Sequence, residues 1–252
     1  MKIKRVIAAA AVIAALTAGQ TVHALSTEKK GYGQGTITDS ENCPTGAADF
    51  NSQYGEFDAY ALTNDKSRII LTFDQGYENG YTAPILDVLK EKNVKAIFFL
   101  TGDYAKKEEA LVKRMIDEGH VIGNHGMTHA SMPELSSDEL KEEVMSLHNF
   151  VLDKYGYEMQ YLRPPCGEFS EESLAECKEL GYKTLMWSFA YVDWKTDAQP
   201  EYSQALERIV SSAHGGGIYL LHSVSSTNAA VLSEAIDLSL IHISEPTRRV
   251  VI

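Results

Sequence analysis

From Lys66 onward, short apolar runs alternate with amphipathic helical patterns, and this alternation constrains the fold more than any other feature. The runs at residues 68–74, 95–100 and 217–222 are mostly apolar, as parallel strands buried on both faces are. Strands that alternate with helices favour a parallel sheet covered by helices, so we predict an α/β fold with a closed or nearly closed (β/α) barrel. Other strands are expected at residues 120–124, 161–163 and 183–189, and helices from residue 82 and at residues 106–118, 136–155, 171–180, 202–213 and 228–237.

Five polar motifs lie at or near the carboxyl ends of these predicted strands, where a βα barrel places its chemistry. Taken singly, each has an ordinary explanation, because an Asp can cap a helix, Arg-Pro-Pro can end a strand, and His or Trp can be core residues. Five such motifs in order along the chain favour a catalytic site instead. They are Thr72-Phe-Asp74-Gln75-Gly76, His125-Gly-Met-Thr-His129, Arg163-Pro-Pro-Cys-Gly167, Trp187-Ser-Phe-Ala-Tyr-Val-Asp193-Trp194 and Leu220-Leu-His222.

The spacing of His125 and His129 is compatible with metal binding. Two imidazoles four residues apart can bind one cation if the turn between them is helical. The spacing alone is weak evidence, but it occurs here with an acid, an arginine and a third histidine at other strand ends. We therefore predict a divalent metal at His125 and His129.

Residues 1–24 have the pattern of a secretory signal peptide: three cations at residues 2–5, an apolar stretch at residues 6–19 and a small-x-small site ending at Ala24. An uncleaved anchor is the alternative, but the apolar stretch is shorter than the roughly 20 residues that span a bilayer. We expect export to the cell wall or the extracellular side of the membrane, with no stable membrane insertion after cleavage.

The charge of the chain excludes one class of partner. The formal charge of the 252-residue chain is −12 and becomes −15 without its first 24 residues, which carry three cations and no acid. Nucleic-acid binding needs clustered Lys and Arg, so we expect no nucleic-acid partner. Cys43, Cys166 and Cys177 are an odd number for an exported chain, and one disulfide or three free thiols are equally compatible with the sequence.

The two ends of the chain differ from its middle. Residues 25–66 are rich in Gly, Ser, Thr, Asn and Tyr, which predicts an extended, loop-rich extension before a catalytic domain at residues 67–237. Residues 238–248 resemble the translation of a sequencing-library adapter, so we expect residues 238–252 to be a non-native tail and the barrel to be truncated. A genuine terminal strand at residues 238–243 is the alternative.

Together the five motifs resemble those of the polysaccharide deacetylases, the carbohydrate esterases of family 4, over residues 68–237. The resemblance implies a distorted (β/α) barrel with a divalent metal at its mouth and hydrolysis of N-acetyl groups on amino sugars. The stretch Phe73-Asp-Gln-Gly-Tyr-Glu-Asn-Gly-Tyr-Thr82 is closest to the branch that deacetylates N-acetylmuramic acid of peptidoglycan when spore cortex forms muramic δ-lactam.

The resemblance also implies residue roles. Asp74 would be the general base, His222 the general acid, Asp193 its orienting partner, and Arg163 the partner of Asp74. His125 and His129 would hold a loosely bound ion of the Zn, Mn or Co type. Gln75 is a doubtful third ligand, because the family usually has a second acid there. We expect substrate contacts from Trp194, Leu220 and Tyr77.

Three functions remain open at this point. The leading one is an exported, monomeric hydrolase acting on N-acetylmuramic acid in peptidoglycan glycan strands during sporulation. The second is an N-acetylglucosamine deacetylase acting on peptidoglycan, chitin oligomers or exopolysaccharide. The third, from another class, is a non-catalytic glycan-binding module in which Gln75 marks lost chemistry.

Overall fold

The computed structural model describes residues 24–242, so residues 1–23 of the predicted signal peptide and residues 243–252 of the predicted tail lie outside the described range. Within that range, one seven-stranded sheet has the order β2-β8-β6-β5-β4-β3-β9, and every pairing in it is parallel. The strands are β2 (Ala59–Tyr60), β3 (Ile69–Gln75), β4 (Ile97–Leu100), β5 (Val121–Asn124), β6 (Tyr161–Leu162), β8 (Lys183–Leu185) and β9 (Gly217–His222).

The two edges of this sheet approach one another, so the barrel is nearly closed. After β2, Leu62 forms an isolated bridge with Gly217 at the start of β9. After β8, Phe189 forms another with Tyr219, and the amide of Ser188 donates to the carbonyl of Ile218 at 2.8 Å. These contacts confirm the predicted distorted (β/α) barrel.

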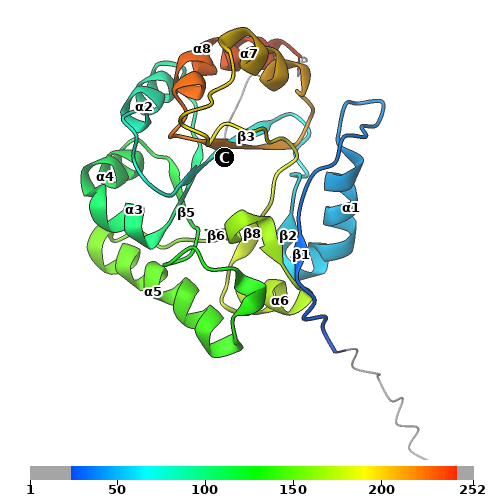
Figure 1. Ribbon diagram of the computed structural model, residues 1–252, viewed down its shortest axis with the longest axis vertical. Coiled ribbons are helices and arrows are strands. Elements are labelled where there is room, and N and C mark those ends of the chain that lie inside the picture. Colours follow the sequence, from blue (N-terminus) through cyan, green and yellow to red (C-terminus); the bar gives the residue numbers. More distant parts are fainter. Residues whose placement is uncertain (1–23, 243–252) are drawn as a thin grey trace, which may run out of the picture.

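Helices surround the strands on the outside of the barrel (Figure 1). The longest, α5, begins after Ser136, whose hydroxyl accepts from the backbone of Glu139 while the Glu139 carboxylate accepts from Ser136. These two reciprocal hydrogen bonds form a capping box at the start of the helix. The other helices after β2 are α2 (Thr82–Glu91), α3 (Gly102–Lys107), α4 (Glu109–Asp117), α6 (Glu171–Glu179), α7 (Tyr202–Ser211) and α8 (Ser226–His242), and α5 spans Ser137–Tyr155.

Strand alternation divides the apolar core into two layers. Leu71 and Phe73 of β3 belong to the large cluster that also contains the buried helix residues. Ile97, Phe99, Leu185 and Ile218 form a smaller cluster from β4, β8 and β9. The side chains of β3 that alternate with the first layer, such as Asp74, therefore project toward the barrel interior.

The expectation of an extended, loop-rich segment at residues 25–66 is wrong for Thr45–Tyr54, which forms helix α1. Its Gly, Asn and Ser residues have low helix propensity, but Ala47, Phe50 and Tyr54 share one buried face. That face packs in a cluster with Phe169 and others, so tertiary burial overrides local propensity. Strand β1 (Lys30–Gly31) pairs antiparallel with β7 (Glu168–Phe169) and fixes this segment to the barrel.

Other boundaries also differ from prediction. The helix expected at residues 106–118 is two helices that meet at Glu108, and the last helix continues to His242 instead of ending at residue 237. Residues 238–242 are thus helical, which contradicts the alternative of a terminal strand there. The three cysteines are free. None of the helices in the described range is long and apolar enough to cross a bilayer.

Candidate active site

A cavity of about 660 Å³ opens at the carboxyl ends of the strands. Tyr77, predicted to contact substrate, is 52% exposed and does not line this cavity. Six other predicted site residues do line it: Asp74, His125, His129, Trp194, Leu220 and His222.

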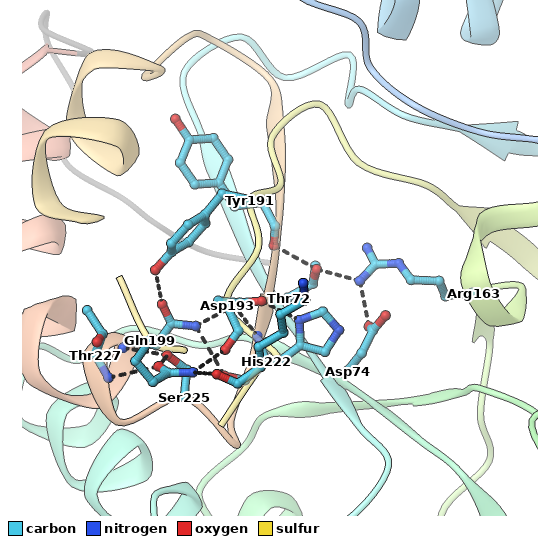
Figure 2. Close-up of polar contacts among 12 residues, drawn as sticks. Thr72, Asp74, Arg163, Tyr191, Asp193, Gln199, His222, Ser225 and Thr227 are labelled. Carbon is cyan, nitrogen blue, oxygen red and sulfur yellow. Dashed lines mark hydrogen bonds and ion pairs between the residues drawn. The ribbon is translucent and has the colours of Figure 1, made fainter. Parts of the chain in front are cut away.

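Asp74 and Arg163 form a buried ion pair at the floor of the site (Figure 2). Arg163 is fully buried, and its Nη1 donates to Asp74 Oδ1 at 2.7 Å and to the hydroxyl of Thr72 at 2.8 Å. Its Nε and Nη2 donate to the carbonyls of Leu185 and Met186, each at 3.0 Å. The guanidinium is thus held by acceptors from both β3 and β8, which fixes its direction toward the carboxylate.

The environment of Asp74 keeps its carboxylate ionised. Burial alone would raise the pKa of Asp74, but the charge of Arg163 and the nearby imidazoles of His125 and His222 lower it below its usual value. One carboxylate oxygen is bonded to Arg163, and the other lies 3.6 Å from His125 Nε2. An ionised, partly unpaired carboxylate facing a cavity is suited to accept a proton.

On another wall of the site, His222 and Asp193 form a second pair (Figure 2). His222 Nδ1 lies 2.7 Å from Asp193 Oδ1, and the backbone N–H of His222 donates to Oδ2 of the same carboxylate at 2.8 Å. Burial lowers the pKa of His222, but the hydrogen bond and charge of Asp193, with the charge of Asp74, outweigh it and raise the pKa above its usual value. Because Asp193 occupies Nδ1, the other ring nitrogen is left for substrate.

His125 and His129 lie together, with ring centroids 4.8 Å apart. The turn between them is not helical, contrary to the condition stated for their spacing, because φ is +82° at Gly126 and +63° at His129. The buried carboxylate of Glu143 on α5 holds this turn. It accepts from the backbone N–H of Thr128 at 2.7 Å and from the Thr128 hydroxyl at 2.9 Å.

The donor set is compatible with a weakly held cation. His125 Nδ1 lies 2.8 Å from the carbonyl of Arg163 and must donate to it, so Nε2 carries the lone pair. Burial lowers the pKa of His125 to about 4, so the ring is neutral, as a metal ligand must be. Gln75 donates to Ser223 at 2.5 Å and its buried Oε1 has no hydrogen-bond partner, but Gln75 does not line the cavity with His125 and His129. Within residues 24–242, no three His, Cys, Asp or Glu side chains are grouped to hold a metal.

The sequence did not predict one wall of the cavity, which the N-terminal segment forms. Tyr32 and Gln34 line the cavity beside Trp187. The Tyr32 hydroxyl donates to the Trp187 carbonyl at 2.6 Å, and the Trp187 indole donates to Gln34 Oε1 at 2.8 Å. These contacts join residues about 155 positions apart, so no local pattern indicates them.

Comparisons with known proteins decide the family. The polysaccharide deacetylase family model matches residues 61–185. The peptidoglycan-N-acetylmuramic acid deacetylase PdaA of Bacillus subtilis is 46% identical over 195 residues, which are 77% of this chain and 74% of that protein. This chain belongs to the polysaccharide deacetylase family. It is therefore an enzyme of a family that hydrolyses the N-acetyl amide bonds of carbohydrates.

Two further comparisons extend this likeness. The structure of Bacillus subtilis PdaA, a family 4 carbohydrate esterase, aligns with a TM-score of 0.80 at 42% identity, covering 84% of this chain and 92% of that one. A peptidoglycan-N-acetylglucosamine deacetylase of Bacillus cereus is 34% identical over 71% of this chain and 65% of its own length. The barrel is thus that of the family.

Proposed function

We propose that this protein is an exported hydrolase that removes the N-acetyl group from N-acetylmuramic acid residues of peptidoglycan. The observation that carries the proposal is the convergence of two pairs, the buried Asp74 with Arg163 and the partly exposed His222 with Asp193, on one cavity. The higher identity to the muramic acid deacetylase, 46% against 34% for the glucosamine enzyme, favours muramic acid as the sugar.

Asp74 is the general base in this proposal. Its lowered pKa keeps it ionised, so it accepts the proton of the water that attacks the acetyl carbonyl. Arg163 holds the carboxylate and compensates its buried charge. The attack gives a tetrahedral species whose nitrogen must be protonated before the carbon–nitrogen bond breaks.

His222 is the general acid. Its raised pKa favours the protonated imidazole, and Asp193 holds the ring through Nδ1 so that Nε2 delivers the proton to the leaving amine. The products are acetate and a glycan with a free amine. Trp194 packs edge-on near His222, with ring centroids 5.5 Å apart, and would form a wall against the sugar.

His125 and His129, with Gln75 Oε1 as a weak third donor, would hold a divalent ion of the Zn, Mn or Co type. Such an ion polarises a carbonyl and lowers the pKa of water. The neutral donor set contributes no ligand charge, so the ion would bind loosely and exchange readily.

The substrate assignment has a chemical consequence. A free amine on muramic acid whose lactyl group carries no peptide lies beside the lactyl carboxylate, and the two can condense to the δ-lactam of spore cortex. The partner is therefore the peptidoglycan glycan strand outside the membrane, and we propose that the protein acts as a monomer.

The alternative, glucosamine deacetylation, takes its support from the Bacillus cereus relative. A non-catalytic glycan binder would have no use for both acid–base pairs.

Mass spectrometry of enzymatically digested peptidoglycan tests the substrate. Treatment of glycan strands that lack stem peptides should remove acetyl groups from muramic acid, and an Asp74→Asn control should remove about 10²- to 10⁴-fold fewer in the same time. Acetyl loss confined to glucosamine would establish the alternative sugar. If wild type releases no acetate from either sugar at saturating glycan with Zn²⁺, Mn²⁺ or Co²⁺ added, the enzymatic proposal is wrong.

A further inference from the structure

The carboxylate of Asp193 accepts three N–H groups, and only two of them come from His222. The third is the side-chain amide of Asn228 in helix α8, whose Nδ2 lies 2.5 Å from Asp193 Oδ2. Asp193 is fully buried and Asn228 is 1% exposed, so this contact is shielded from water. A buried carboxylate with three donors has its position defined more strictly than one held by its histidine alone.

The orientation of the Asn228 amide follows from its neighbours. An ionised carboxylate only accepts hydrogen bonds, so the Asn228 atom that faces Asp193 must be the nitrogen. The same Nδ2 lies 3.1 Å from the backbone carbonyl of His222, which also only accepts. The Asn228 oxygen accepts from the hydroxyl of Tyr191. Both amide hydrogens and the oxygen are therefore used.

The backbone of Asn228 is fixed as well. Its N–H donates to the hydroxyl of Ser225 at 3.0 Å, which caps the start of α8. The Ser225 hydroxyl donates to Gln199 Oε1 at 2.5 Å, and Gln199 Nε2 donates to the backbone carbonyl of Asp193 at 2.7 Å. The first turn of α8 is thus bonded to the loop that carries Asp193, and that turn sets the place of the Asn228 amide.

We propose that Asn228 is a positioning residue for His222. Its amide connects the Asp193 carboxylate to the main chain of His222, so the acid, its partner and the strand end move as one unit. The inference rests on the proposed role of His222 as the proton donor. Asn228 itself touches neither substrate nor reacting atoms, and it acts by holding the imidazole at the angle needed to protonate the leaving amine.

Three variants separate positioning from simple stability. Asn228→Ala removes the bridge. Tyr191→Phe leaves Asn228 in place but removes the hydrogen bond that orients its amide. Thr227→Val is the matched control, since the Thr227 hydroxyl donates to the carbonyl of Pro200 at the same helix end and contacts neither Asp193 nor His222.

The readouts are steady-state acetate release and the NMR signal of the His222 Nδ1 proton, assigned by its absence in His222→Ala. We expect kcat to fall about 10- to 100-fold in Asn228→Ala, as for other residues that orient a functional ligand, with KM within about twofold of wild type. Tyr191→Phe should lose about two- to tenfold, the effect of one hydrogen bond. The Nδ1 signal should shift or broaden in both variants and stay unchanged in Thr227→Val.

Near-native kcat and an unmoved Nδ1 signal in Tyr191→Phe and Asn228→Ala would overturn the proposal. Tyr191→Phe carries the test alone if Asn228→Ala does not fold, and an unmoved signal there with native kcat is then decisive. Failure of the proposed function has a different signature. If His222→Ala keeps its acetate release while the Nδ1 signal moves in Asn228→Ala, Asn228 positions the ring but the ring is not the acid.

Discussion

Asp193→Asn should disable His222 as an acid, because the change reverses the hydrogen bonding that Asp193 provides. The carboxylate accepts from His222 Nδ1, from His222 N and from Asn228 Nδ2. An amide of the same shape has only one accepting atom. If the amide oxygen of residue 193 occupies the Oδ2 position, it accepts from the His222 backbone and from Asn228. The new NH₂ group of residue 193 then faces His222 Nδ1, which must be deprotonated to accept from it.

The size of the effect follows from the causes of the His222 pKa. Burial lowers this pKa, and the hydrogen bond and charge of Asp193 are the main influences that raise it. Without them the pKa falls. Since the acid must be protonated, wild-type activity is lost as pH rises through the raised pKa, and in Asp193→Asn the same loss begins at lower pH. Near pH 7 we expect kcat to fall by about 10²–10⁴, the range for a lost general acid.

The assay is acetate release measured as a pH profile of kcat, with circular dichroism to confirm the fold. Asp197→Asn is the control, because it replaces a carboxylate by an amide four residues away, at an exposed position. A kcat for Asp193→Asn within about threefold of wild type, with a superimposable pH profile, would refute the reasoning. Asp193 would then be a structural acceptor only.

Three other predictions concern the rest of the site. Asp74→Asn should lower kcat by about 10²–10⁴ while circular dichroism stays native, and near-native acetate release would exclude Asp74 as the base. Arg163→Met should lower the free energy of unfolding by about 3–5 kcal/mol, because it leaves a buried carboxylate and two carbonyls without donors. Urea denaturation measures this, and a loss below about 1 kcal/mol would contradict it. Gln75→Asp should tighten divalent-metal binding in calorimetric titrations by adding a charged ligand, and unchanged affinity would mean that residue 75 does not contact the ion.

Much of the barrel was predictable because its strands are buried on both faces. The run at residues 217–222 was placed without error, and residues 68–74 lie within one residue of β3. Such strands are continuous apolar segments that end where a polar side chain faces the cavity. The strand predicted at residues 183–189 is longer than the observed one, since β8 ends at Leu185 and the chain then leaves the sheet toward Trp187. The apolar composition of a segment does not indicate the residue at which its hydrogen bonding to neighbouring strands ends.

The residues that support the site were harder to predict, for two different reasons. Tyr32 and Asn228 reach it through contacts between distant segments, and nothing near them in sequence indicates a partner. The position of Glu143, in contrast, could have been recognised from the sequence. It lies on the face of α5 that buries Leu140, Val144 and Leu147, and an acid on such a face requires donors. Here Thr128, in the turn between His125 and His129, supplies them.

The Asp74–Arg163 and His222–Asp193 pairs divide the acid–base work because their environments shift the pKa values of Asp74 and His222 in opposite directions. Arg163 lowers the pKa of Asp74, and Asp193 raises the pKa of His222. The carboxylate is therefore ionised and the imidazole protonated over the whole interval between the two pKa values, which is wider than the interval between an ordinary Asp and an ordinary His. Each charge also stabilises the other across the cavity, since Asp74 contributes to the raised pKa of His222 and His222 to the lowered pKa of Asp74. Substitution of Arg163 should therefore narrow the active pH range at its acidic side, and substitution of Asp193 should narrow it at its alkaline side.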